Sequence, residues 1–399
     1  MDFGHDTPAN LGFDAKRLER ITSYLSRCVD EGKAAGFGAL IARRGKVAYE
    51  QYVGFKNLES KAPVDASTIF RIYSMSKPIT CAAALSLWEE GAFGLMDPVK
   101  EYLPEFSNTQ VLTSYDGSKL QTRPAALPLT IWNLFTHTAG IPYGTGGTVT
   151  DRYYADARKR LEAERPNGTT REVIEFIASL PLAFDPGTGW LYGFAHDIVG
   201  RLVEVLSGEK LSAFLQKRIF EPLGMKDTAF WAPKEKIDRL ASIYDRGPGD
   251  RLVQSEKNEV RAAPPAFESG GSALLSTVGD YAKFCQMLLG PTRGAEKVLS
   301  PATIRLMATP QLSESAQADF AAGSKPGYGY GLGVRVMTNP ARGGRLGSLG
   351  EFGWDGAAST WMCVDPSQEL IAVLMLQLRP YASHGIADRF QRMLYAALE

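Results

Sequence analysis

Residues 68–91 read TIFRIYSMSKPITCAAALSLWEEG, and the expected fold is built outward from this stretch. Its first six residues are rich in β-branched and aromatic side chains, which favours a strand. From about Ser74 to Glu90 the residues favour a helix, and Gly91 is a suitable terminator. Because this helix is rich in alanine, it can pack closely against neighbours on several sides. We therefore expect a strand that leads directly into a central, buried helix.

The residues before this stretch predict a helix followed by a β-hairpin. Asp14 is a suitable N-cap for the helix. After it, apolar side chains recur at helical spacing at Leu18, Ile21, Leu25 and Cys28. The segments FGALIARR (37–44) and VAYEQYVG (47–54) are rich in strand formers and flank a turn around Gly45.

The rest of the chain changes character twice. Residues 96–309 alternate helical patterns with loops rich in proline and glycine. Strand patterns return in YGYGLGVRVM (328–337), AASTWMCV (357–364) and ELIAVLMLQL (369–378), and an amphipathic helix follows from about His384 to Leu398. This order predicts an α/β (α+β) fold with an antiparallel sheet flanked by the N- and C-terminal helices. Residues 1–95 and 310–399 would form that domain, with a mainly helical domain (96–309) inserted and the active site at the junction.

Composition excludes several classes of protein. The 399 residues carry 44 Lys plus Arg and 44 Asp plus Glu, so nothing indicates a nucleic-acid partner, which usually requires a basic excess. The apolar fraction of 44% is typical of globular proteins. The four cysteines are scattered, which argues against disulfides or structural zinc. Without a signal sequence or a long apolar run, we expect a cytoplasmic protein with no membrane partner.

One short motif remains after a screen for catalytic signatures. The chain contains no G-x-S-x-G, H-E-x-x-H or Walker A sequence. It does contain S-x-x-K at Ser74–Lys77, and a second match at Ser207–Lys210. The second match falls at the exposed, charged end of a predicted helix, whereas the first lies where a strand gives way to the buried helix.

This position suits nucleophilic catalysis. Ser74 would face the positive end of the helix dipole, and Lys77, three residues later, would share its helix face. An amine surrounded by apolar side chains loses the solvation of its charged form. A neutral lysine can then take the serine proton during attack on a carbonyl carbon.

Two further motifs connect this pair to a known superfamily. Tyr192-Gly193-Phe194 follows about 115–120 residues after S-x-x-K, and Trp354-Asp355-Gly356 precedes a late strand. In this order the motifs resemble those of the serine β-lactamase and penicillin-binding-protein superfamily, and most closely those of the class C β-lactamase-like esterases called family VIII carboxylesterases. The resemblance runs from about residue 15 to 395. It includes LFTHTAGIPYG (134–144), FEPLGMKDTAF (220–230) and SGGSALLSTVGDYAKF (269–284).

The resemblance implies a role for each matching residue. Ser74 would be the acylated nucleophile and Lys77 its activator. Tyr192 would share in proton transfer and protonate the leaving alcohol. Trp354–Gly356 would replace the family's Lys-Thr-Gly motif, and the backbone N–H groups of Ser74 and Ala357 would form the oxyanion hole.

The chain departs from the lactamase pattern at two positions. Phe194 replaces the asparagine of Tyr-x-Asn, and Trp354 replaces the lysine of Lys-Thr-Gly. An amide and a cation that would hold a charged lactam are therefore lost. The site as written favours an uncharged acyl ester with an apolar body. Five aromatic residues are candidates for the pocket or, equally, for the core: Trp354, Phe352, Tyr143, Trp190 and Tyr328.

Three other titratable residues are less suitable candidates for a catalytic role. His137 invites comparison with Ser-His hydrolases, but in the related family its Thr-His-Thr-Ala-Gly turn is structural. His196, four residues after Tyr192, is expected to be solvated or to cap a helix. Glu268 is a conceivable deacylating carboxylate, although relatives of the class C type use tyrosine and lysine instead.

We predict a serine carboxylesterase that hydrolyses short-chain acyl esters through an acyl-enzyme on Ser74, with no metal or organic cofactor. Its partner would be a small-molecule ester. The alternatives are a β-lactamase, a D-aminopeptidase or an acyltransferase on the same scaffold, and a non-catalytic sensor module. The aromatic loops suit a lid, a pocket or an interface equally well, so a homo-oligomer stays open.

Overall fold

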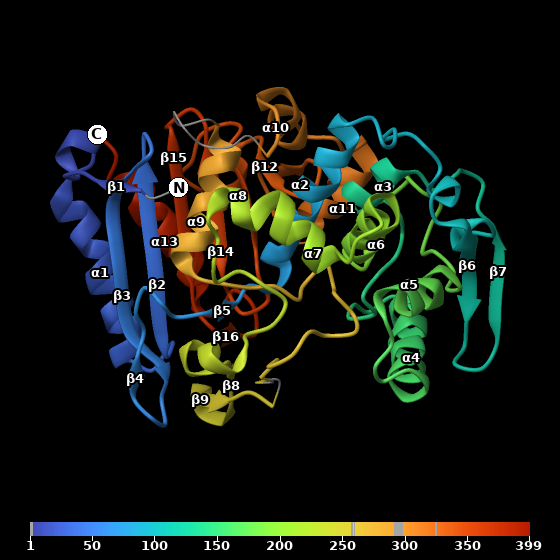
Figure 1. Ribbon diagram of the computed structural model, residues 1–399, viewed down its shortest axis with the longest axis horizontal. Helices are drawn as coiled ribbons and strands as arrows, with labels where there is room; N and C mark the ends of the chain where they lie inside the picture. Colours follow the sequence, from blue (N-terminus) through green and yellow to red (C-terminus); the bar gives the residue numbers. More distant parts are fainter. Residues whose placement is uncertain (1–2, 257, 259, 291–297, 324) are drawn as a thin grey trace.

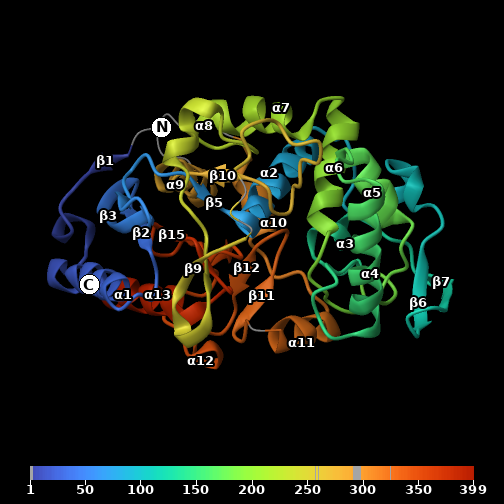
Figure 2. The ribbon, with the colours of Figure 1, turned by 90° about the horizontal axis from the view of Figure 1, so that it is seen from below.

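Figures 1 and 2 show the computed structural model of the chain, which describes residues 3–256, 258, 260–290, 298–323 and 325–399. Its main element is a nine-stranded sheet in the order β1-β3-β2-β15-β14-β13-β12-β11, with β4 paired to β3. All neighbours are antiparallel except the short β1, which runs parallel to β3. The strands are β1 (Gly4–His5), β2 (Gly36–Arg43), β3 (Lys46–Asn57), β4 (Ala62–Pro63), β11 (Tyr328–Tyr330), β12 (Arg335–Met337), β13 (Phe352–Asp355), β14 (Trp361–Asp365) and β15 (Leu370–Met375).

Helices cover both faces of this sheet. On the central strand β2, Ala39 and Ile41 join one buried cluster while Leu40 and Ala42 join the other, as the two-residue period of a strand requires. The first cluster is completed by α1 (Ala15–Asp30) and α13 (Ile386–Ala396), and the second by α9 (Val278–Leu289). Figure 2 shows α1 and α13 side by side at the same end of the molecule.

The remaining helices gather mostly beside the sheet and at the end opposite α1 (Figure 1). The β6–β7 hairpin (Gln110–Tyr115, Leu120–Pro124) lies at the far edge. The helices are α2 (Ser76–Glu89), α3 (Ile131–Phe135), α4 (Val149–Glu164), α5 (Thr170–Ala178), α6 (Ala195–Ser207), α7 (Leu211–Leu215), α8 (Glu221–Leu223), α10 (Pro301–Met307), α11 (Glu314–Ala322) and α12 (Pro340–Gly343). The other short strands are β5 (Phe70–Arg71), β8 (Tyr244–Arg246), β9 (Leu252–Gln254), β10 (Leu275–Ser276) and β16 (Leu378–Arg379).

Helix α2 is the buried centre that its sequence predicts. Every residue from Ser76 to Leu87 is buried, and the helix packs against α6. The division of the chain at 95/96 and 309/310 stays a prediction, and two helices cross it in space. Helix α9 belongs to the inserted segment but packs on β15, whereas α2 belongs to the N-terminal segment but packs on the helices of the insert.

The predicted fold class is confirmed, with one local correction. Asp14 caps α1 by accepting a hydrogen bond from Arg17 N (3.1 Å), and the expected hairpin is β2–β3. Residues 328–337, however, are not one strand. They fold into the hairpin β11–β12, because Gly333 adopts a φ of +89° and Gly331 N donates to the Val334 carbonyl (2.8 Å). Among the described residues, no helix is both long and apolar enough to cross a bilayer.

Candidate active site

Ser74 lies in a tight turn directly before α2. The turn is a 3-10 helix, Tyr73–Met75, in which Tyr73 has a φ of +45°, an unusual conformation for a residue with a bulky side chain. The surrounding structure holds this conformation, because the Tyr281 hydroxyl donates to the Met75 carbonyl (2.7 Å). The serine is therefore presented at the start of a rigid, buried helix.

Lys77 is fully buried and contacts three polar partners. Its Nζ lies 3.3 Å from Ser74 Oγ, 3.0 Å from Tyr143 Oη and 2.8 Å from the Gly271 carbonyl oxygen. No carboxylate of the described residues lies within ion-pair distance of this amine. Serine and lysine thus meet as the S-x-x-K spacing predicts.

Two tyrosines surround the amine in different ways. Tyr143, which sequence reasoning placed only among the pocket residues, bonds to Lys77 through its hydroxyl. The ring of Tyr192 instead lies under Lys77, with Nζ 4.5 Å from the ring centroid, and its hydroxyl accepts a hydrogen bond from Trp354 Nε1 (3.3 Å). Burial, and then Asp197, raises the pKa of Tyr143 well above its usual value, so this side chain is a neutral phenol.

A close backbone contact brings these tyrosines together. Pro142 and Gly193, the neighbours of Tyr143 and Tyr192, form an isolated β-bridge. A Cβ on Gly193 would lie 1.9 Å from the Ile141 carbonyl oxygen. Only glycine allows this approach, so the glycine of the Tyr-Gly-Phe motif has a steric function.

Gly356 performs the same function on the opposite side of the cleft. It ends β13 against the segment that carries the serine, and an added Cβ would lie 2.4 Å from the Ile72 carbonyl oxygen. Its N–H donates to the Thr360 carbonyl (2.8 Å). Ala357, the next residue, is exposed and lines the cleft with Ser74.

The aspartate of Trp-Asp-Gly belongs to a buried charge network. Asp355 accepts hydrogen bonds from Arg335 Nη1 (3.0 Å) and the Tyr381 hydroxyl (3.0 Å), and it pairs with Lys325. Burial alone would raise the pKa of Asp355, but Arg335 and Lys325 hold it below its usual value. Lys325 therefore places a cation beside the cleft, and the carboxylate of Asp355 offsets the charge of this cation.

Two cavities meet at Ser74, and Tyr192 and Ala357 also line both. The narrow cavity has about 290 Å³ and a mainly apolar lining, in which five of the eleven residues are aromatic. The wide cavity has about 750 Å³ and a more polar lining. Besides the shared residues, the narrow cavity is lined by Trp190, Phe320, Gly323, Lys325, Trp354, Asp355, Gly356 and Tyr381.

The expected pocket residues divide into two groups. Trp190 and Trp354 line the narrow cavity, while Tyr143 and Phe194 line the wide one. The other two candidates lie elsewhere: Phe352 is buried in the main core, and the Tyr328 hydroxyl donates to Glu351 (3.1 Å). Sequence reasoning missed Phe320, Lys325 and Tyr381, which come from two separate segments with no motif of their own.

His137 and His196 form a fully buried pair, with ring centroids 4.2 Å apart. The expectation that His196 is solvated is wrong, whereas the capping contact is present, at the last residue of α3. Its Nε2 lies 3.1 Å from the Phe135 carbonyl oxygen, and its ring is covered on all sides. His137 packs among aromatic rings, including Tyr192 (4.8 Å between centroids). Glu268 accepts hydrogen bonds from the N–H and the hydroxyl of Ser212 (2.7 Å each), so its carboxylate helps to anchor α7.

The histidine pair is expected to make the fold sensitive to acid. Burial, and then Lys77, lowers the pKa of His196 from 6.5 to about 3, and burial also lowers the pKa of His137. Between pH 6.5 and 3 the unfolded chain binds protons that the folded chain excludes, so stability falls as the pH falls. For one such group the slope is about 1.4 kcal/mol per pH unit. Urea unfolding at pH 7 and pH 5 should therefore show a clear loss of unfolding free energy.

The histidine variants test this assignment. His196→Gln should lose less unfolding free energy between pH 7 and pH 5 than the unmutated chain does. His5→Gln, which removes an exposed histidine, is the matched control and should leave the difference unchanged. An equal pH dependence in all three proteins would contradict a neutral buried pair.

The fold and the site together define a serine hydrolase: an exposed cleft with a serine hydroxyl, a buried lysine amine and aromatic walls. The chain belongs to the Beta-lactamase family, whose profile matches residues 21–397. The superfamily predicted from the motifs is thereby confirmed.

Relatives of known sequence and structure agree with this assignment. The chain is 34% identical over 360 residues to protein Rv1367c of Mycobacterium tuberculosis (strain ATCC 25618 / H37Rv), covering 88% of each. It is 28% identical over 391 residues to esterase EstB of Burkholderia gladioli, covering 92% of each. Among solved structures it is similar to EstCE1, a hydrolase with promiscuous acyltransferase activity, with 25% identity, a TM-score of 0.79 and coverage of 96% and 98%.

Proposed function

We propose that the chain is a carboxylesterase that hydrolyses short-chain acyl esters through an acyl-enzyme on Ser74. The observation that carries this proposal is the 3.3 Å contact of Lys77 Nζ with Ser74 Oγ at the mouth of an aromatic cavity. The likeness to the esterase EstB and to the hydrolase EstCE1 supports the same class of reaction.

The contacts of Lys77 suit a neutral amine. Such an amine has two N–H donors and one lone pair. The donors match the Gly271 carbonyl (2.8 Å) and Tyr143 Oη (3.0 Å), which leaves the lone pair for the Ser74 hydroxyl.

In acylation, Ser74 Oγ attacks the ester carbonyl carbon as its proton passes to Lys77 Nζ. The carbonyl oxygen becomes an oxyanion, for which the backbone N–H groups of Ser74 and Ala357 are the proposed donors. The C–O bond to the alcohol then breaks. The leaving oxygen then takes a proton. We propose that this proton passes from the Lys77 ammonium to the leaving oxygen through the Tyr192 hydroxyl.

In deacylation, water takes the place of the departed alcohol. It gives a proton to the neutral Lys77 amine as its oxygen attacks the acyl carbon. The bond to Ser74 Oγ breaks, and Oγ recovers its proton from Lys77. The products are a carboxylic acid and an alcohol, and the enzyme returns to its starting state.

The residues at the cleft favour a neutral ester over a lactam. Trp354 and Phe194 replace the cation and the amide of the lactamase pattern with aromatic surface. The ammonium of Lys325 is already offset by Asp355. An anionic acyl portion would therefore lose its hydration in the narrow cavity without gaining an unpaired cationic partner.

Parallel assays test the proposed function. A nitrophenyl butanoate, a chromogenic cephalosporin and a D-alanyl nitroanilide are offered to the same preparation, with and without an acceptor alcohol. We expect kcat/KM for the ester to exceed that for the other two by at least about 100-fold, a difference of about 2.7 kcal/mol in transition-state binding. Faster lactam or amide turnover would overturn the esterase proposal. Predominant transfer to the alcohol would indicate an acyltransferase, and tight ligand binding without turnover a sensor.

The two tyrosines are expected to respond differently to the leaving group. A nitrophenolate departs without protonation, whereas an ethoxide needs a proton. Tyr192→Phe should therefore lower kcat for an ethyl ester by about 10²-fold but for a nitrophenyl ester by much less. Tyr143→Phe, which removes a partner of Lys77, should lower both by a similar factor. Equal losses for both esters in Tyr192→Phe would contradict its proposed role.

A further inference from the structure

The wide cavity carries an excess of positive charge that the ester chemistry does not use. Four arginines line it: Arg158, Arg165, Arg261 and Arg379. Among the residues that the structure describes, two carboxylates do so, Glu162 and Asp197. Hydrolysis of a neutral ester requires none of these cations. The excess of arginines over carboxylates in this cavity therefore suits an anionic ligand.

The carboxylates offset little of this charge. Asp197 is buried, and its oxygens accept hydrogen bonds from Gly271 N (3.1 Å) and the Ser269 hydroxyl. Burial raises the pKa of this carboxyl, while Lys77 and the two hydrogen bonds oppose that effect. Glu162 makes only a loose ion pair with Arg158 (3.9 Å), and its side chain is 71% exposed.

Three of the arginines have guanidinium groups free to take an anion. Arg165 and Arg261 form no ion pair with any residue that the structure describes. Within the described part of the chain, Arg261 donates one long hydrogen bond, to the Ala273 carbonyl (3.4 Å). Arg379 is held weakly, with Nε 3.8 Å from Asp245.

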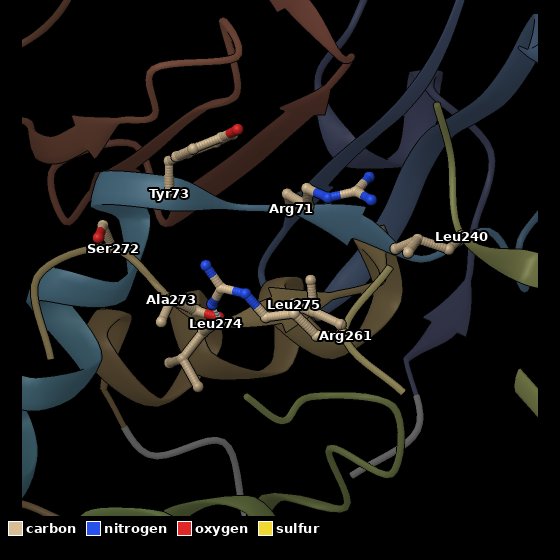
Figure 3. A pocket seen from close by; sticks show the side chains of 8 residues that line it. All are labelled: Arg71, Tyr73, Leu240, Arg261, Ser272, Ala273, Leu274 and Leu275. Carbon is tan, nitrogen blue, oxygen red and sulfur yellow. Dashed lines mark hydrogen bonds between the residues drawn. The ribbon is translucent and has the colours of Figure 1, made fainter. Parts of the chain in front are cut away.

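The positive charge extends to the residue before the nucleophile. Tyr73 lines the wide cavity beside Ser74, and it also lines a small cavity of about 40 Å³ with Arg71 and Arg261 (Figure 3). Figure 3 shows the Arg261 side chain reaching toward Ala273 and Ser272. Burial raises the pKa of Tyr73, while the positive charges of Arg71, Arg379 and Arg261 oppose that effect.

We infer that the wide cavity binds the departing half of the substrate through an anionic group on it, a carboxylate or a phosphate. This inference rests on the proposed esterase function. The aromatic cavity suits an apolar acyl group, and both cavities open on Ser74, so the alcohol or thiol lies in the wide one. Guanidinium groups bind carboxylate and phosphate through paired, charge-assisted hydrogen bonds.

Matched substrates with one acyl group test the inference. For a carboxylate, 4-carboxyphenyl butanoate is compared with the neutral 4-carbamoylphenyl butanoate. For a phosphate, butanoyl coenzyme A is compared with the butanoyl thioester of N-acetylcysteamine. The variant Arg261→Gln/Arg379→Gln removes two of the cations. The control Arg20→Gln/Arg305→Gln removes two exposed arginines that do not line either cavity.

The unmutated enzyme should prefer the anionic member of one pair by about 10-fold in kcat/KM, which two charge-assisted contacts can supply. The Arg261→Gln/Arg379→Gln variant should lose that preference through KM, with the neutral substrate changed less than about 2-fold. The control should retain it. The pair that responds identifies the anion. An unchanged ratio in both pairs overturns the inference while the esterase proposal stands.

A binding measurement separates this inference from the esterase proposal. In Ser74→Ala, calorimetry compares 4-hydroxybenzoate with 4-hydroxybenzamide, and coenzyme A with N-acetylcysteamine. If Ser74→Ala binds an anionic compound more tightly than its neutral partner, and adding Arg261→Gln and Arg379→Gln to this variant abolishes the difference, the cationic site is supported. This holds even if the unmutated enzyme turns over no ester. Turnover of neutral esters by the unmutated enzyme, with no preference for either anion in binding, overturns it.

Discussion

Replacing Ser74 with alanine is expected to lower kcat for a nitrophenyl acyl ester by at least about 10⁴-fold, the scale seen when a serine nucleophile is removed. The loss is large because the proposed reaction forms a covalent bond to the Ser74 oxygen. Among the residues described, no other hydroxyl in the cleft lies at the start of α2 with a lysine amine 3.3 Å away. Among the described residues, Ser74 Oγ has a hydrogen bond only with the Lys77 side chain, so the fold should persist. Steady-state rates and a thermal melt measured on the same preparation check both expectations.

The second S-x-x-K match offers a matched control. Ser207→Ala removes a hydroxyl that bonds the Val203 carbonyl (2.7 Å) at the end of α6, in the same sequence pattern. Its rate should stay within about 2-fold of the unmutated enzyme. A Ser74→Ala protein that still hydrolyses esters would show that another group is the nucleophile.

Replacing Lys77 with methionine is expected to lower kcat by about 10³-fold, within the range of a lost general base. Methionine fills a similar volume but cannot accept the Ser74 proton. It also leaves the Gly271 carbonyl and Tyr143 Oη without the bonds of 2.8 and 3.0 Å that they share with the amine. Buried unpaired groups cost about 1–3 kcal/mol each, so some loss of stability accompanies the loss of rate.

The corresponding control is Lys210→Met, at the exposed lysine of the second match. It should change neither kcat nor the melting temperature by a measurable amount. If Lys77→Met melted like the unmutated enzyme and kept more than a tenth of its rate, the amine would not be the base. Restoration of acylation by an added primary amine would strengthen the assignment.

Local patterns made much of the fold predictable. The helical spacing after Asp14, the two strands around Gly45 and the alanine-rich run after Ser74 each specify an element through nearby residues. The S-x-x-K contact was predictable for the same reason, because residues three apart share a helix face. Motif order then extended the prediction to Tyr192 and Trp354, which do lie at the cleft.

Contacts between distant segments were not predictable in this way. Tyr143 reaches Lys77 only because its loop meets the Tyr192 loop at the Pro142–Gly193 bridge, which no periodicity encodes. His196 was misjudged because its burial depends on packing of α6 against α2. The sequence pattern at 328–337 predicts one strand and not a hairpin, because glycine leaves the strand pattern intact while permitting a turn.

The arginines of the wide cavity show the same limit. Arg158 comes from α4, Arg261 from a loop and Arg379 from β16. They lie more than 100 residues apart in sequence, and the balanced net charge of the chain gives no sign that they converge. Local charge is a property of the folded surface.

Mass spectrometry after treatment with a slowly hydrolysed acyl ester or a nitrophenyl alkylphosphonate ester tests the central claim most directly. The account predicts a mass increase equal to one acyl or phosphonyl group, located by peptide mapping at Ser74 and missing in Ser74→Ala. Modification of a different residue, or consumption of the ester with no covalent adduct under rapid quench, would contradict it.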